Sequence, residues 1–416
     1  MTEYRILEII QTIFKCPSTL EEARFDPNFF TRDRKMTFSD ILFFMLDMDK
    51  SSMQNRLDNY FHRNNINTNM SQQAMSEARS KFDHSPFEKV FRAIVHEIYK
   101  DTRTLKHFHG YLPIAVDGVH FKLPRRHDLQ EIYGVSGQDY NVAATASVFF
   151  DPLNCYTIDA VITKAHPNER KEFLDNLDYL LDNYSELMAK SVFLADCGYQ
   201  SREVFKRLIG HDIKFVIRCG ANAASEIVNA SSNDSVIEIG DNTMLRVIKF
   251  ENKYGEVITL ATNLLDIPNN EFPELYALRW TIESSFNILK NTIGLEKFSG
   301  KTPNSILQDF WISMVLMNIT TIFKNIADKN IENKHKNSNN KNKYKVCIAK
   351  LVTTLKNNYT FAGLRKYAIQ IILEMPRIIA LITRATVAIV KDSKLHPPRE
   401  KRTVAKIFRL NLKSCL

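Results

Sequence analysis

PELYALRWTIESSFNILKNTIGLEKF, residues 273–298, reads as an amphipathic helix with a row of polar side chains beside its apolar stripe. At about 100° per residue, the apolar positions gather on one side: Leu275, Leu278, Ile282, Phe286, Leu289 and Ile293. The same spacing places a phenol, a guanidinium, a carboxylate and an ammonium on an adjacent face: Tyr276, Arg279, Glu283 and Lys290. At about 1.5 Å per residue this row is roughly 21 Å long, which suits a face laid along a nucleic-acid backbone.

The ends of this stretch also favour a helix. Pro273 is acceptable in a first turn, Glu274 suits the positive end of the helix dipole, and Gly294 is a natural stop. A simpler interpretation is a surface helix in which Arg279 and Glu283 form an ordinary ion pair, contributing roughly 0.2–0.5 kcal/mol. Taken alone, the stretch favours the simpler interpretation.

Two aspartates upstream follow or interrupt short apolar runs that are typical of buried strands. Asp117 comes after the run 114–116, and Asp196 comes after the run 192–195. A charged group placed against a buried strand is costly unless it is paired or bound to a metal. Both aspartates therefore need an explanation.

The simpler explanation is local. Asp196 would cap a helix beginning near Ser201, and Asp117 would stabilise a turn beside Gly118. For either aspartate alone this stays open, but together with Glu283 they favour a catalytic site. Three carboxylates can hold two divalent cations about 3.5–4 Å apart for in-line attack on a phosphodiester, and Mg²⁺ prefers such oxygen ligands.

These residues also match a known family. The chain resembles the DDE transposases of bacterial insertion sequences, and more narrowly the branch called insertion-sequence family four. The match is carried by two strand-associated aspartates and a spaced signature: Asp117, Asp196 and Tyr276-x2-Arg279-x3-Glu283-x6-Lys290. The likeness covers about residues 112–297, and the segments 36–61 and 72–91 are similar to the N-terminal region of this group.

The resemblance implies an α/β fold: a ribonuclease-H-like mixed-sheet core with a β-rich insertion between the second aspartate and the glutamate. It implies cut-and-paste DNA transposition, in which phosphodiester hydrolysis at the transposon ends is followed by strand transfer of the 3′-OH. Asp117, Asp196 and Glu283 would be the catalytic residues and would hold two Mg²⁺ ions, with Mn²⁺ able to substitute.

The resemblance also implies how DNA is held. Tyr276, Arg279 and Lys290 would contact phosphates of the transposon end, and Trp280 would stack on a flipped-out base. Such stacking contributes about 1–3 kcal/mol per base, although core packing is an alternative for Trp280. The expected partners are double-stranded DNA (terminal inverted repeats and target DNA) and a second copy of the chain, as a homodimer in the end-paired complex.

Two other function classes remain open. One is a catalytically silent, transposase-derived DNA-binding protein, against which the three acids and the complete signature argue. The other is a Mg²⁺-dependent nuclease without transposition, which would make no strand-transfer products.

The pattern around the aspartates alternates between strands and helices. After the strand to Asp117, strands are expected at 141–150, 154–164, 191–196 and 214–218, and helices at 169–184 and 201–210. Glu169 and Glu172 open the helix 169–184, where their charge suits the positive helix end. A period of two over 235–240, 243–252 and 256–265 then predicts a small antiparallel unit.

Charge and periodicity divide the chain into four parts. Residues 324–416 carry 21 Lys and Arg against 5 Asp and Glu, a charge of +16, while the remainder holds −7. We expect an N-terminal helical domain (1–105), a catalytic domain (106–323) with its insertion (219–267), a Lys/Asn-rich linker (324–345) and a basic helical region (346–416). The charge of the N-terminal domain is balanced, and it is the resemblance that implies DNA binding there.

Composition predicts a cytoplasmic protein, and the resemblance implies a bacterial one that associates with the nucleoid when it binds DNA. The content of 44% hydrophobic and 25% charged residues is that of an ordinary globular protein. No apolar run reaches transmembrane length, so no membrane partner is expected. Six scattered cysteines include no CxxC pair, which argues against a zinc site.

Overall fold

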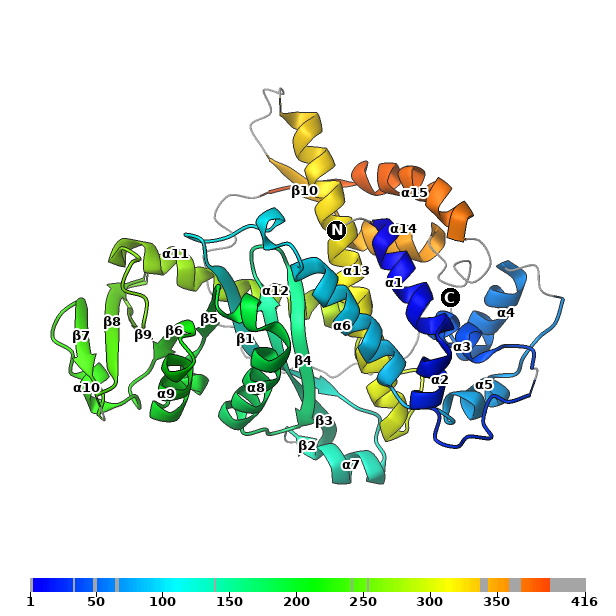
Figure 1. Ribbon diagram of the computed structural model, residues 1–416, viewed down its shortest axis with the longest axis horizontal. Helices are drawn as coiled ribbons and strands as arrows, with labels where there is room; N and C mark the ends of the chain where they lie inside the picture. Colours follow the sequence, from blue (N-terminus) through cyan, green and yellow to red (C-terminus); the bar gives the residue numbers. More distant parts are fainter. Residues whose placement is uncertain are drawn as a thin grey trace.

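The fold comes from a computed structural model, which describes residues 3–32, 34–47, 51–63, 67–137, 140–240, 242–252, 254–336, 343–358 and 368–389. The predicted linker 324–345 and basic region 346–416 therefore lie partly outside the described residues. The N-terminal helices and the central sheet lie side by side, with a long helix, α13 (Pro303–His335), between them (Figure 1).

The central sheet has the mixed order expected of a ribonuclease-H-like core. Its first strands are β1 (Leu112–Lys122), β2 (Val135–Ser136), β3 (Asn141–Asp151), β4 (Tyr156–Lys164), β5 (Ser191–Ala195) and β6 (Lys214–Cys219). β4, β3 and β1 pair antiparallel, whereas β5 and β6 continue parallel to β1. The short β2 pairs with the start of β3. The predicted α/β fold class is confirmed.

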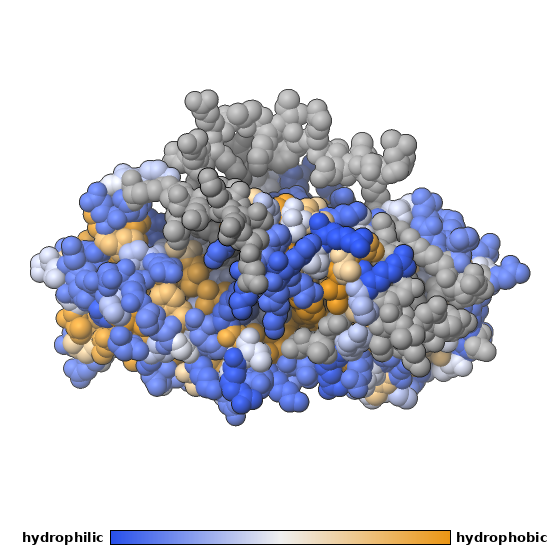
Figure 2. Space-filling model, turned by 90° about the horizontal axis from the view of Figure 1, so that it is seen from above, coloured by the Kyte–Doolittle hydropathy of each residue, from blue (hydrophilic) through white to orange (hydrophobic). Residues whose placement is uncertain are grey.

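The predicted insertion forms three antiparallel strands that extend this sheet. They are β7 (Asp234–Glu238), β8 (Met244–Glu251) and β9 (Val257–Thr262), and β9 pairs with β6. The short α10 (Ser225–Val228) precedes β7. In Figure 2, apolar residues reach the surface among polar ones at this end of the molecule, where Val236 and Val257 are exposed.

Helices cover both faces of the sheet because strand side chains alternate between the faces. On one face lie α8 (Glu169–Met188) and α9 (Arg202–Gly210), with the Phe173 ring of α8 against Phe193 of β5. On the other face, the neighbouring Val192 and Leu194 pack in a cluster with Leu275. The short α7 (His127–Tyr133) and the turn η1 (Thr102–Thr104) lie in the connections beside β1.

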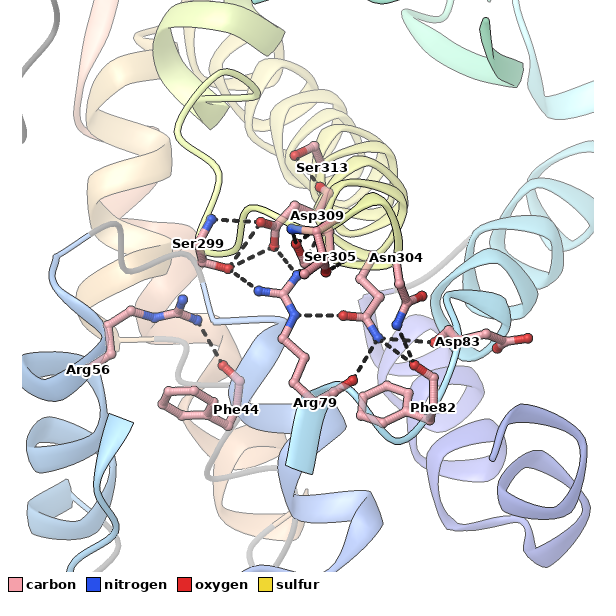
Figure 3. Close-up of polar contacts among 12 residues, drawn as sticks. Phe44, Arg56, Arg79, Phe82, Asp83, Ser299, Asn304, Ser305, Asp309 and Ser313 are labelled. Atoms are coloured by element: carbon pink, nitrogen blue, oxygen red, sulfur yellow. Dashed lines mark hydrogen bonds and ion pairs between the residues drawn. The ribbon is translucent and has the colours of Figure 1, made fainter. Parts of the chain in front are cut away.

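The N-terminal region is helical, as predicted, and packs against α13. Its helices are α1 (Glu3–Lys15), α2 (Pro17–Ala23), α3 (Phe38–Met45), α4 (Met53–Arg63), α5 (Gln72–Arg79) and α6 (Ser85–Tyr99). Arg79 joins it to the remainder of the chain through buried contacts (Figure 3). Its guanidinium donates to Gln308 at 2.6 Å, to Ser299 at 2.6 Å and to Asp309 at 3.0 Å. The N-terminal helices are thus anchored to α13 and to the loop that follows the 273–298 stretch.

Helix α13 extends past residue 323, the predicted end of the catalytic domain. Residues 324–335, predicted as part of the linker, instead continue this helix, so the linker prediction is wrong for them. The reason is that the buried face continues at helical spacing through Phe323, Ala327 and Ile331. By length and composition alone α13 could cross a membrane, but 94% of its most apolar window is buried in the protein, as in a core helix.

Beyond α13 the described residues form α14 (Ile348–Asn358), α15 (Ala368–Thr383) and a two-stranded sheet of β10 (Tyr344–Val346) and β11 (Thr386–Ala388). Both helices contact α13.

Candidate active site

The 273–298 stretch is helical, but its pitch changes twice. It runs through α11 (Phe272–Ala277), a 3₁₀ turn η4 (Leu278–Trp280), α12 (Thr281–Asn287) and a π-helical turn η5 (Ile288–Ile293). The turn η3 (Asn269–Glu271) leads into it, and Gly294 ends it with a φ of 82°. A uniform 100° per residue therefore does not hold, because a 3₁₀ turn has three residues per turn and a π turn more than an α-helix.

The polar row lies against the sheet instead of facing open solvent. Tyr276 and Arg279 are only 5% and 4% exposed, and η4 and α12 contact β1. Glu283 and Lys290 are partly exposed. The expectation of an exposed face laid along DNA is therefore wrong for Tyr276 and Arg279. The reason is that a helical pattern alone does not show which face packs inward.

Asp117 of β1 and Asp196, the residue directly after β5, lie on one face of the sheet. Ala115 of β1 and Leu194 of β5 are register partners, and each aspartate lies two residues further along its chain. Asp196 keeps an extended backbone, with φ −86° and ψ −173°, so the alternation of faces continues to it. The structure therefore brings these two predicted carboxylates together.

Glu283 is connected to this pair through a buried arginine. The Arg279 guanidinium lies 3.3 Å from an oxygen of Asp117 and 3.9 Å from an oxygen of Glu283. Burial raises the pKa of Asp117 to about 6, Arg279 and the Gly118 N–H oppose that rise, and the charges of Asp196 and Glu283 add to it. Asp117 therefore responds to the charge of both other acids.

The local explanations of the aspartates account for only part of the geometry, and no turn follows Asp117 because β1 continues through Gly118 to Lys122. Asp117 accepts a hydrogen bond from the Gly118 N–H, and Asp196 accepts one from the Gly198 N–H, both at 2.8 Å. The latter caps the short turn η2 (Cys197–Tyr199), whereas the helix α9 is capped by Ser201 and not by Asp196. The contact between Asp117 and Arg279 goes beyond either local role.

Tyr276, Trp280 and Lys290 surround the centre in different ways. The Tyr276 hydroxyl is buried without a hydrogen-bond partner in bonding geometry, and burial raises its pKa to about 12. The Trp280 ring centre lies 4.3 Å from the Arg279 guanidinium carbon, so this ring stacks on a cation. Lys290 acts on His120 of β1, whose pKa is lowered by burial and by the lysine charge.

The donor set suits a divalent cation, although the described residues do not form a finished cage. Among them, no three His, Cys, Asp or Glu side chains are already grouped closely enough to hold a metal ion. Arg279 lies between Asp117 and Glu283 and supplies positive charge where a metal ion would otherwise supply it. Carboxylate oxygens fit Mg²⁺, but a cation held by both acids would require this guanidinium to withdraw.

A further carboxylate lies at this centre that the sequence did not indicate. Glu169, the first residue of α8, places one oxygen 2.7 Å from where a Cβ of Gly198 would lie, next to the Asp196 carboxylate. Its position at a helix start was fully explained by the helix dipole. The signal that could have found it is Gly198, two residues after Asp196.

Comparison with known families agrees with this geometry. Residues 108–319, just over half of the chain, match the family described as the transposase DDE domain. The chain belongs to the transposase DDE domain family. The match includes both aspartates, Glu283 and the β-rich insertion, and it ends within α13, so this DDE transposase carries its complete candidate centre inside the family domain.

No curated protein matches this DDE transposase. Among solved structures it is similar to a piggyBac transposase, in a cryo-EM structure of the synaptic complex with hairpin DNA. The two chains are 12% identical with a TM-score of 0.48, over 91% of this chain and 84% of that chain.

Proposed function

We propose that this DDE transposase catalyses cut-and-paste transposition of a bacterial insertion sequence of family four. The reaction is phosphodiester hydrolysis at the transposon ends, followed by attack of the freed 3′-OH on target DNA. The observation that carries this proposal is the placement of Asp117 and Asp196 on one face of adjacent strands, with Glu283 connected to them through Arg279.

Asp117, Asp196 and Glu283 would hold two Mg²⁺ ions, or Mn²⁺ in their place. When bound, the ions would supply an activated water or hydroxyl and positive charge for the leaving oxygen. The carboxylates are well suited to this, because the strands β1 and β5 and the helix α12 hold them on rigid elements.

Arg279 gives the centre a way to respond to DNA. Its guanidinium is buried between two carboxylates, and a DNA phosphate brought to the centre competes with them for it. Lys290, partly exposed on the same stretch, offers a second phosphate contact, and the buried Tyr276 hydroxyl needs a partner. We assign Tyr276, Arg279 and Lys290 to the transposon-end phosphates on this ground, and Trp280 to a base beside them.

The substrate is double-stranded DNA with terminal inverted repeats, and the working form is a homodimer that pairs two ends. Such a protein acts in the bacterial cytoplasm, on the nucleoid. The N-terminal helices α1–α6 would contribute DNA binding as the first unit, residues 1–105, ahead of the catalytic unit, residues 106–323.

The test is cleavage of DNA carrying the inverted repeats that flank the gene, in Mg²⁺ and in Mn²⁺. Asp117→Ala, Asp196→Ala and Glu283→Ala should each lose cleavage by at least about 10³-fold, since several kcal/mol of charge stabilisation is removed. Asp175→Ala, at an exposed position of α8 paired with Lys171, is the control and should cut normally. Normal cutting by any of the three variants would overturn the metal assignment.

Two other outcomes would indicate a different function. DNA binding without cleavage in either metal would indicate a catalytically silent DNA-binding protein. Cleavage without strand-transfer products would indicate a nuclease that does not transpose.

A further inference from the structure

Glu169 and Asp196 converge on the same point of the backbone. An oxygen of Glu169 lies 2.7 Å from the position a Cβ of Gly198 would take, and an oxygen of Asp196 lies 3.0 Å from that position. The separation of the two oxygens cannot exceed the sum of these distances. Two carboxylates, from a helix start and from a strand end, therefore lie over one glycine.

Glu169 also reaches toward the strand that carries Asp117. Its second oxygen lies 3.8 Å from the position of a Cβ on Gly118, the residue after Asp117. Tyr199, 2% exposed, responds to this arrangement: burial raises its pKa, and the charges of Asp117, Glu169 and Asp196 raise it further. The charges of all three carboxylates therefore act on the Tyr199 phenol.

The start of α8 is fixed in this position. Arg170 donates from Nε to the carbonyl oxygen of Gly198 at 3.0 Å, and Asn168 caps the helix through the Lys171 N–H at 3.3 Å. The contacts of both its chain neighbours therefore place the backbone of Glu169 beside the turn that follows Asp196, and the Glu169 side chain itself is exposed.

In the part of the chain that the structure describes, the charges of Arg170 and Arg279 act on Glu169 and Asp196 respectively, but neither arginine forms an ion pair with these acids. Arg279 forms its ion pairs with Asp117 and Glu283, and no ion pair there involves Glu169 or Asp196. Two close like charges repel and destabilise the folded state, by about 1 kcal/mol at 4 Å even in bulk water. A cation bound between them would convert this repulsion into attraction.

We propose that Glu169 is a fourth carboxylate of the catalytic centre and that it binds a divalent cation together with Asp196. This proposal rests on the proposed function and adds a ligand to the same site. It assigns to the first residue of α8 a role in holding Mg²⁺, beyond its favourable charge at the helix start.

The experiment measures Mn²⁺ binding to the full-length, metal-free protein by isothermal titration calorimetry. Glu169→Gln should weaken Mn²⁺ binding about 10-fold or more, in line with the loss of a group at a metal centre. Glu172→Gln is the matched control, because it removes the same charge from the same first turn of α8 and should bind Mn²⁺ normally. Glu169→Asp, which keeps the carboxylate, should recover part of the affinity.

Cleavage provides a second measurement. For Glu169→Gln, the Mg²⁺ concentration that gives half-maximal cleavage should rise about 10-fold, and added Mg²⁺ should recover much of the rate. Thermal unfolding without metal should show Glu169→Gln as stable as the parent or more so, since it removes a repulsive charge.

The outcomes separate this proposal from the proposed function. If Asp196→Ala abolishes cleavage while Glu169→Gln keeps the parent Mn²⁺ affinity and Mg²⁺ dependence, Glu169 is not a ligand and the transposase mechanism stands. Equal weakening by Glu169→Gln and Glu172→Gln would also reject the ligand, because helix charge would then be the cause. If Asp117→Ala and Asp196→Ala both cut normally, the proposed function itself fails.

Discussion

The two halves of the carboxylate centre balance their charge in different ways. In the Arg279 half, Asp117 and Glu283 share the buried guanidinium of Arg279. In the Gly198 half, the Asp196 and Glu169 carboxylates meet over a glycine, and no ion pair in the described residues neutralises them. The first half contains an ion-paired cation of the chain, whereas Arg170 and Arg279 act on the second half only from beyond ion-pair distance.

This difference sets the cost of metal binding in each half. A cation entering the Gly198 half removes a repulsion and displaces nothing that the structure shows. A cation entering the Arg279 half must compete with a guanidinium that is 4% exposed. We therefore expect the Gly198 half to bind a metal ion more readily. We also expect a DNA phosphate to attract Arg279 away from Asp117 and Glu283, so that the Arg279 half can then bind a metal ion.

The largest expected effect is on stability, from Arg279→Met. In metal-free protein it should cost about 3–5 kcal/mol, because Asp117 would stay largely buried without its cation. Urea denaturation in the presence of a chelator measures this loss. Arg126→Met, which breaks an exposed pair with Asp128, is the control and should cost less than about 1 kcal/mol.

Added Mg²⁺ sharpens the same experiment. It should stabilise Arg279→Met more than the parent, since the metal ion can replace the lost guanidinium charge. If Mg²⁺ stabilises both proteins equally, Arg279 does not occupy a cation position.

The second effect is on cleavage, from Gly198→Ala. The new Cβ would lie 2.7 Å from Glu169 and 3.0 Å from Asp196, so it would push the two carboxylates apart. Cleavage should fall about 10–100-fold, while stability changes little because the end of a flexible glutamate can move. Gly210→Ala, whose Cβ would meet nothing within 4 Å, is the matched control. Equal cleavage by both variants would show that Gly198 is not part of the catalytic site.

Much of the fold could be predicted from local patterns. The short apolar runs became β1, β3, β4, β5 and β6, and the period-two runs became β7–β9. The pairing of β9 with β6, which joins the insertion to the central sheet, was not predicted, because the pattern within a strand does not specify a partner distant in the chain.

The site was predicted in part. The apolar runs before Asp117 and Asp196 predicted two carboxylates beside buried strands, and the parallel register of β1 and β5 brings them near one another. The burial of Tyr276 and Arg279 could not be read from the helical spacing, which gives faces but not the packing partner of each face. Glu169 was missed because a helix start already explained its charge, and its contact with the Asp196 turn depends on how α8 docks.

A third effect is the pH dependence of stability. The folded protein raises the pKa of Asp117 from 3.8 to about 6, so it holds that proton more strongly than the unfolded chain does. The resulting stability is present below about pH 4 and is lost as the pH rises to about 6. Asp117→Asn removes this dependence, and its stability relative to the parent should rise by on the order of 1–2 kcal/mol from about pH 4 to about pH 7.

Chelator-containing denaturation across this range measures the difference between the two proteins. The buried Asp151 and Asp159 also have pKa values raised to about 6, but they are present in both proteins and cancel. A difference that is flat with pH, or that falls, would show that Asp117 is not held in a buried position.

The smallest expected effect concerns Trp280 and tests whether its ring stabilises Arg279. Its ring stacks on the Arg279 guanidinium at 4.3 Å, a contact that contributes about 0.5–1 kcal/mol. Trp280→Leu should cost that amount in metal-free protein, and the cost should vanish in an Arg279→Met background, as a double-mutant cycle would show. If the two substitutions instead act independently, Trp280 does not stabilise Arg279, and only its proposed contact with a DNA base remains.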